Sequence, residues 1–184
     1  MKNQTKKTIT TKRIVLIILS FPITLVLYIL LFSGNIKYSE EIVINANIDT
    51  VSALFDNPYN MKEYMDGIES YTILSGNIRE VGSKAEIIAI YSEEGAVKSE
   101  IIMIEEIITN NLPDEKKFTY TADDVYNIVT NRLVKVSEDQ TRFINEQEFE
   151  FQGYMKIMGF FMPSVFQQQS RIYLENFKDF VESK

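Results

Sequence analysis

Residues 153–183 read GYMKIMGFFMPSVFQQQSRIYLENFKDFVES and predict one long amphipathic helix. Apolar residues recur there at intervals of three and four, which places them on one face of a helix. The stripe comprises Tyr154, Ile157, Met158, Phe161, Val165, Ile172, Tyr173, Phe177 and Phe180. Pro163 is expected to kink or restart the helix, because its ring removes a backbone hydrogen bond. The apolar face of such a helix needs a partner surface that buries it.

Six segments before this helix have the alternating pattern and the β-rich composition of strands, and turn residues separate them. We predict strands over Ser70–Ser75, Ala85–Ser92, Val97–Thr109, Lys116–Ala122, Val125–Val136 and Thr141–Gln152. The connections between successive strands are short, which favours antiparallel neighbours.

A further strand, Ile36–Ala46, is followed by two short helices. The first runs through Val51 and Phe55 and ends at Asn57-Pro58, because the residue before proline resists the helical conformation. The second covers Asn60 to Met65. We therefore predict an α+β fold in which a curved, seven-stranded antiparallel sheet wraps around the C-terminal helix. An apolar hollow is expected between the helix and the sheet.

Two stretches carry a resemblance to a known superfamily. Residues 42–76, IVINANIDTVSALFDNPYNMKEYMDGIESYTILSG, resemble the opening of the START-like, or SRPBCC, superfamily, with Tyr64 where tryptophan is usual. Residues 153–183 are similar to its terminal helix, which finishes at Leu174, Phe177 and Lys178. The resemblance covers residues 36–184 and implies the helix-grip fold. Members, including lipid-transfer and polyketide cyclase/dehydrase-like proteins, bind hydrophobic ligands, and only some of them catalyse reactions.

The N-terminal region predicts a membrane anchor. Residues 14–32, IVLIILSFPITLVLYILLF, carry no charge, and nineteen residues are about what a transmembrane helix needs. Five basic residues lie in the tail 1–13, so we expect this tail in the cytoplasm and the domain, residues 36–184, outside it, after a linker of residues 33–35. A cleaved signal peptide is the alternative. The apolar run exceeds the usual signal core of about 7–15 residues, and no A-x-A-like cleavage site follows.

The composition excludes several classes of function. Residues 33–184 contain fourteen basic and twenty-six acidic residues, a net charge of −12 that disfavours nucleic acid as a partner. The absence of cysteine rules out disulfides and thiolate catalysis, and the absence of histidine rules out a histidine-based triad. No glycine-rich phosphate loop or metal-binding motif is present, so we expect no cofactor.

The candidate ligand-binding residues lie on the last strand, on the first half of the terminal helix and at two tyrosines. On the strand RFINEQEFEF, three glutamates share one face, so the opposite face should point inward. Its Asn145 and Gln147 either orient a ligand or satisfy each other or a water; Arg132 is a possible neighbour. The full set is Tyr64, Tyr120, Phe143, Asn145, Gln147, Phe149, Tyr154, Met158, Phe161, Met162 and Val165.

The acidic pairs Glu93-Glu94, Glu105-Glu106 and Asp123-Asp124 are interpreted as surface residues. Three functions remain open. We prefer a membrane-anchored domain that binds a hydrophobic molecule or lipid. The alternatives are a cyclase-like enzyme that uses tyrosine or carboxylate residues, favoured by a buried ionisable group in the cavity, and a non-binding envelope interaction module. The last predicts a collapsed core and an exposed apolar patch.

Overall fold

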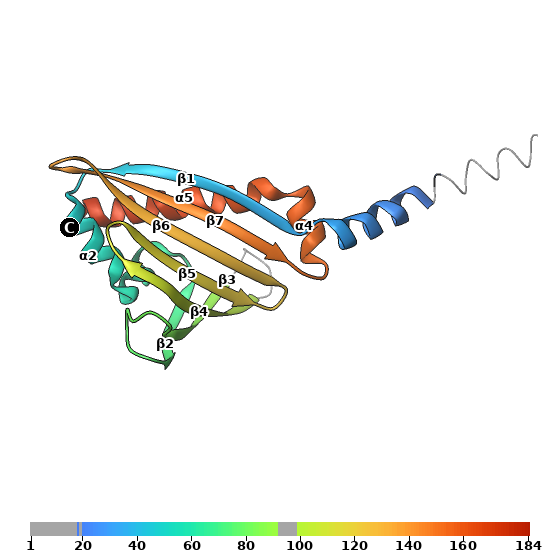
Figure 1. Cartoon of the computed structure of the whole chain (residues 1–184), viewed down its shortest axis with the longest axis horizontal. Coiled ribbons are helices and arrows are strands. Elements are labelled where there is room, and N and C mark those ends of the chain that lie inside the picture. The colour runs from blue at the N-terminus through green and yellow to red at the C-terminus, as the bar shows by residue number, and fades with distance from the viewer. Residues whose placement is uncertain (1–17, 19, 92–98) are drawn as a thin grey trace, which may run out of the picture.

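The computed structural model describes residue 18 and residues 20–91 and 99–184. The helices and strands, in chain order, are β1 (Asn35–Ile44), α2 (Ile48–Asp56), the 3-10 helix η1 (Pro58–Asn60), α3 (Met61–Tyr64), β2 (Ile68–Ser75), β3 (Lys84–Tyr91), β4 (Ser99–Asn111), β5 (Glu115–Ala122), β6 (Val125–Ser137), β7 (Gln140–Phe151), α4 (Met155–Phe161) and α5 (Pro163–Glu182). Figure 1 shows their arrangement.

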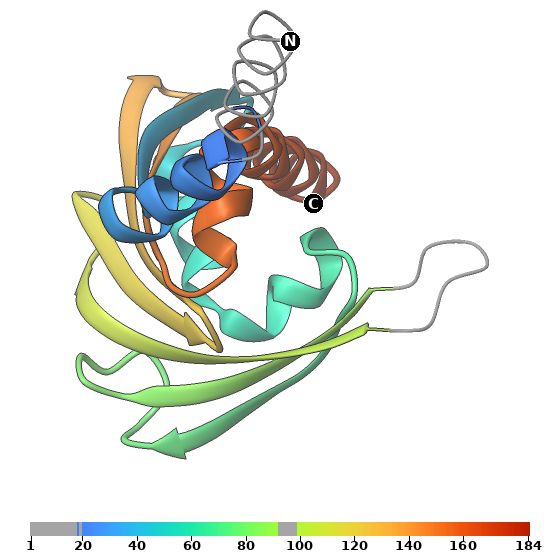
Figure 2. The same cartoon turned by 90° about the vertical axis from the view of Figure 1, so that its right-hand side faces the viewer.

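The described strands form one seven-stranded antiparallel sheet in the order β1-β7-β6-β5-β4-β3-β2. Strands β2 to β7 pair with their neighbours in the chain, and β1 pairs with β7, Ile42 opposite Phe143. Viewed end-on, the sheet curls, and the helices lie on its concave side (Figure 2). The predicted antiparallel sheet and long C-terminal helix are confirmed.

An aromatic core joins the sheet to the helices at the C-terminal half of α5. Phe177 is fully buried and lies with its ring centroid 5.3 Å from that of Phe143 on β7 and 5.6 Å from that of Phe55 on α2. Edge-to-face packing of this kind is the geometry that aromatic rings favour. Phe143, predicted as a ligand-binding residue, is fully buried in this core.

The predicted break at Pro163 is confirmed. Helix α4 ends at Phe161, Met162 has non-helical backbone angles (φ −130°, ψ 44°), and Pro163 occupies the first turn of α5. That position suits proline, because the first helical N–H has no partner within the helix. The terminal segment therefore consists of two helices with separate faces.

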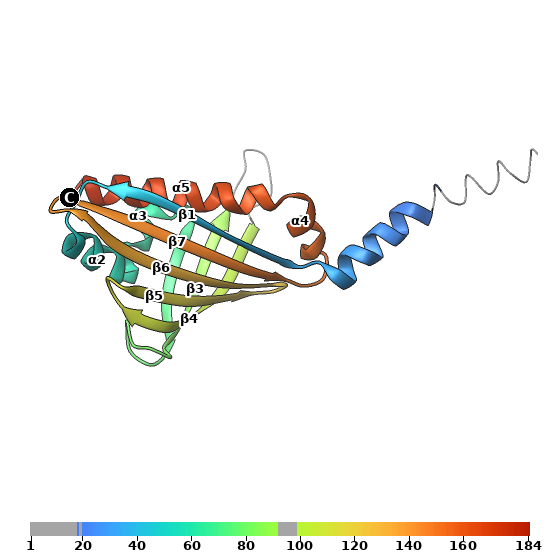
Figure 3. The ribbon, with the colours of Figure 1, turned by 45° about the horizontal axis from the view of Figure 1, so that its top comes forward.

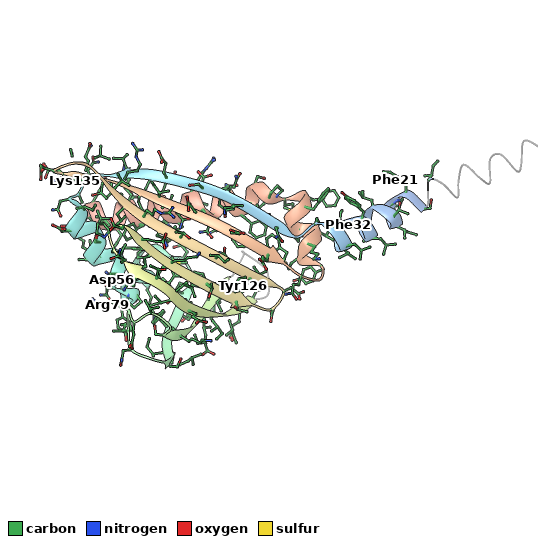
Figure 4. All side chains as sticks on the ribbon, viewed as in Figure 1. Phe21, Phe32, Asp56, Arg79, Tyr126 and Lys135 are labelled. Carbon is green, nitrogen blue, oxygen red and sulfur yellow. The ribbon has the colours of Figure 1, made fainter. Side chains whose placement is uncertain are left out.

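The N-terminal helix extends away from the sheet at the end where α4 lies (Figure 3). Residues 20–32 are helical, and residues 33 and 34 connect them to β1. Lys156 of α4 donates a hydrogen bond from Nζ to the carbonyl oxygen of Leu30, at 2.9 Å. Phe21 and Phe32, both exposed, mark the two ends of the described helix in Figure 4.

The predicted anchor at 14–32 is only partly covered by these observations. Residues 14–17 and 19, like the basic tail 1–13, lie outside the described residues. Within the part of the chain that is described, no helix is both long enough and apolar enough to cross a membrane.

Candidate functional site

A cavity of about 400 Å³ lies between the concave face of the sheet and the helices. All seven described strands contribute side chains to its walls, and helices α2, α3, α4 and α5 contribute side chains opposite the sheet. Most of the lining is apolar, including Ile87, Met103, Ile107, Phe118 and Val129. A concave, largely apolar space with a few polar groups is typical of small-molecule sites.

Glu105 of β4 is the carboxylate of this cavity, and only 2% of it is exposed. The hydroxyl of Tyr71 donates to Oε1 and that of Tyr120 donates to Oε2, each at 2.8 Å. Burial raises the pKa of Glu105, and these two hydrogen bonds and the charge of Lys116 oppose the rise. The protonated form of Glu105 is therefore more favourable in this site than it would be in water.

The interpretation of Glu105-Glu106 as two surface residues is wrong for Glu105. Consecutive strand residues point to opposite faces, so Glu106 is outside, where it pairs with Lys84 at 3.1 Å. Glu93 and Glu94 lie outside the described residues, and Asp123 is exposed in the turn before β6.

Four tyrosines lie near the carboxyl and favour their neutral form, and two of them, Tyr71 and Tyr120, donate hydrogen bonds to it. Burial, with the charge of Glu105, raises the pKa of each of them above its ordinary value. They are Tyr64 of α3, Tyr71 of β2, Tyr120 of β5 and Tyr173 of α5. An ionised phenol beside Glu105 would place two like charges in a poorly hydrated space.

A buried ion pair lies at another part of the lining. Lys116, 3% exposed, places Nζ 2.7 Å from Oδ1 of Asp56 and over the rings of Phe55 and Phe118, at 5.6 and 5.1 Å. Burial lowers the pKa of Lys116, and Asp56 opposes the shift. The Arg79 guanidinium also approaches Asp56, at 3.4 Å, and the two residues lie side by side in Figure 4.

A row of side-chain amides crosses β6 and β7. Asn127 donates to Gln147 at 2.8 Å, Gln147 donates to Asn145 at 2.8 Å, and Asn145 donates to Asn131 at 2.7 Å. The row ends with a 3.5 Å bond from Asn131 to the carbonyl oxygen of Lys116. The inward face predicted for Asn145 and Gln147 is confirmed, and the two side chains satisfy each other.

Five of the predicted ligand-binding residues line the cavity, and six do not. Those in the lining are Tyr64, Tyr120, Asn145, Gln147 and Phe149. Phe143 lies in the core behind it, and Tyr154, Met158, Phe161, Met162 and Val165 are 39–68% exposed. The break at Pro163 explains why these last five side chains are exposed, because α4 and α5 do not share one continuous apolar face. Met155, Phe166, Gln169, Ser170 and Tyr173 face the cavity instead. Whether any of these residues binds a ligand stays a prediction.

Sequence reasoning missed Glu105, Lys116 and Tyr71. A signal for Lys116 existed, because it alternates with Phe118 and Tyr120 on the inward face of β5. For Glu105 the pattern was ambiguous, since isoleucine or methionine occupies both faces of β4 around it.

No protein-family model and no curated protein matches the chain. Solved structures with the same fold do. A conserved protein from Geobacillus kaustophilus has a TM-score of 0.67 at 14% identity and covers 80% of this chain and 96% of its own. The Zhui aromatase/cyclase from Streptomyces sp. R1128 has a TM-score of 0.62 at 11% identity, with coverages of 80% and 94%. Norcoclaurine synthase from Thalictrum flavum, in complex with dopamine and hydroxybenzaldehyde, has a TM-score of 0.60 at 15% identity, with coverages of 82% and 88%. At these identities the similarity establishes the fold.

Proposed function

We propose that the domain binds a hydrophobic small molecule in the cavity between α5 and the curved sheet. The observation that carries the proposal is the cavity of about 400 Å³ with mostly apolar walls. An interaction module with a collapsed core leaves no such space. Two proteins of this fold, the aromatase/cyclase and norcoclaurine synthase, are named for reactions of small organic molecules, which supports the same use of the cavity here.

Two tryptophan substitutions on β4 test ligand binding. Met103 lines the cavity, whereas its neighbour Ile102 is 49% exposed on the other face. Met103→Trp should narrow the cavity and weaken saturable binding of a panel of fluorescent fatty acyl and isoprenoid probes. Ile102→Trp adds the same ring outside and should leave binding unchanged. Equal binding by both variants and the unsubstituted protein would place the probes elsewhere and reject the proposal.

We also propose that residues 14–32 tether the domain to a membrane, with the tail 1–13 in the cytoplasm. The uncharged run and the exposed apolar side chains of helix 20–32 support a tether. Because the chain has no cysteine, Asn3→Cys and Asp139→Cys provide single-site reporters. An impermeant maleimide applied to intact cells should label only the Asp139→Cys variant. Labelling of Asn3→Cys alone would reverse the orientation, and recovery of the protein without membranes would exclude the tether.

A second candidate function is acid–base catalysis by Glu105. The specific observation is a carboxyl that is almost fully buried in the cavity, held by two phenols, with a raised pKa. Nitrobenzisoxazole, which opens when a base removes its ring proton, reports on such a carboxylate. The unsubstituted protein and Glu106→Gln should accelerate the opening, and Glu105→Gln should not. Equal rates for all three proteins would count against catalysis by Glu105.

A further inference from the structure

Glu105 forms no ion pair in the described part of the chain. Among the residues that the structure describes, no lysine or arginine nitrogen lies within ion-pair distance of its carboxylate, and its hydrogen-bond partners are the two phenols. Two basic residues in the described cavity wall, Lys116 and Arg79, are already paired with Asp56, at 2.7 and 3.4 Å. A negative charge on Glu105 is stabilised by the two phenols and, from a greater distance, by the charge of Lys116, but it has no ion-pair partner among the described residues, and a buried charge without one is unfavourable.

A second hydrogen-bond acceptor, the side chain of Asn127, lies two strands away from Glu105 on the same face of the sheet. Glu105 is opposite Tyr120 in the pairing of β4 with β5, and Tyr120 is opposite Asn127 in the pairing of β5 with β6. Directly paired residues point to the same face, and all three line the cavity. With neighbouring strands about 4.8 Å apart, the backbones of Glu105 and Asn127 are about 10 Å apart.

The oxygen of Asn127 is free to accept a hydrogen bond. Oδ1 is buried and has no partner among the described residues. The amide nitrogen of Asn127 donates to Gln147, and each following amide donates onward in the same direction. Asn127, which lines the cavity, is thus the start of the row, and its buried oxygen without a partner is costly.

A protonated amine satisfies both groups. It carries a positive charge and up to three N–H donors. These complement the carboxylate of Glu105 and the amide oxygen of Asn127. A carboxylate or phosphate ligand would meet Glu105 as a like charge. A hydroxyl can donate to Asn127 but leaves the charge of Glu105 without a counterion.

We propose that the cavity selects hydrophobic amines, with the ammonium group between Glu105 and Asn127 and the apolar body against the remaining lining. This inference rests on the proposed binding of a hydrophobic molecule and adds the chemical class of its polar end.

The test compares octylamine, octanol and octanoate with the full chain in lipid nanodiscs, with binding to empty nanodiscs subtracted. The unsubstituted protein should bind octylamine about tenfold more tightly than octanol, as expected for a charge-assisted contact. Glu105→Gln, which keeps the shape of the side chain, should reduce this preference to within about twofold while octanol binding persists. Asn127→Leu should weaken octylamine binding by about threefold or more.

Glu106→Gln is the matched control, because it removes one negative charge at the adjacent position on the outer face. It should retain the preference for octylamine. Octanol binding distinguishes the two proposals. If octanol binds but octylamine has no advantage, or if Glu105→Gln keeps the advantage, amine selection is overturned and hydrophobic binding stands. If none of the three probes binds, both proposals fail.

Discussion

Glu105 and Glu106 are consecutive residues of β4 that lie on opposite faces of the sheet. Glu105 accepts hydrogen bonds from Tyr71 and Tyr120 inside the cavity, and Glu106 pairs with Lys84 on the outer face. The pair provides an internal control, because the same substitution at either position removes one carboxylate but only one of them belongs to the cavity.

The first prediction concerns the pH dependence of stability. The folded protein raises the pKa of Glu105, so the folded state binds this proton more tightly than the unfolded state does. The free energy of unfolding should therefore fall as pH rises from about 4.5, the ordinary value, through the raised pKa. The slope contributed by Glu105 is about 1 kcal/mol per pH unit within that window. The groups that face Glu105 are Tyr64, Tyr71, Tyr120, Tyr173 and Lys116.

Urea unfolding between pH 4 and pH 8 measures this effect. Glu105→Gln should lose that part of the slope and equal or exceed the unsubstituted protein in stability at neutral pH. Glu106→Gln should keep the slope. The account of Glu105 is wrong if Glu105→Gln and the unsubstituted protein show parallel pH profiles.

The second prediction concerns the amide row. Asn145→Leu removes both the donor to Asn131 and the acceptor of Gln147, and leaves two buried polar groups unpaired. We expect a loss of about 1–3 kcal/mol in the free energy of unfolding. Glu150→Leu, on the exposed face of the same strand, should change it by less than about 0.5 kcal/mol. Similar values for both variants would contradict the structural role of the row.

The third prediction concerns Asp56 and Lys116. Asp56→Asn leaves a buried ammonium without its carboxylate and should lower the free energy of unfolding by about 3 kcal/mol. The double variant Asp56→Asn/Lys116→Met removes both charges and keeps an apolar stem against Phe55 and Phe118, so it should recover most of that loss. Additive losses in the double variant would show that the two residues are not coupled.

The fourth prediction separates the core from the exposed helix. Phe143→Ala leaves a hole beside Phe55 and Phe177 and should cost about 3–5 kcal/mol of stability. Phe161→Ala removes an aromatic ring that is 59% exposed on α4 and should change stability little. Thermal unfolding of both variants measures the difference. A larger loss in Phe161→Ala would mean that this ring is covered in the folded protein.

The sequence predicts the sheet and its helix better than it predicts the polar site. Alternation of three glutamates with Asn145 and Gln147 was enough to orient β7, because exposed charges and buried amides fall on different faces. Helical spacing placed the apolar residues from Tyr154 to Val165 on the same helix face as the apolar residues that follow them. The break at Met162 separates two helices, and these side chains are exposed instead. The position of Glu105 in the cavity could not be predicted from the sequence, because its environment depends on Tyr71 and Tyr120, which come from two other strands.

Native mass spectrometry of the protein purified from its own cells tests the central claim most directly. The unsubstituted protein and Ile102→Trp should retain a bound hydrophobic molecule that is depleted in Met103→Trp, because Met103 lines the cavity and Ile102 does not. An identical adduct on all three proteins, or no adduct together with no saturable uptake of any added probe, would contradict ligand binding in the cavity.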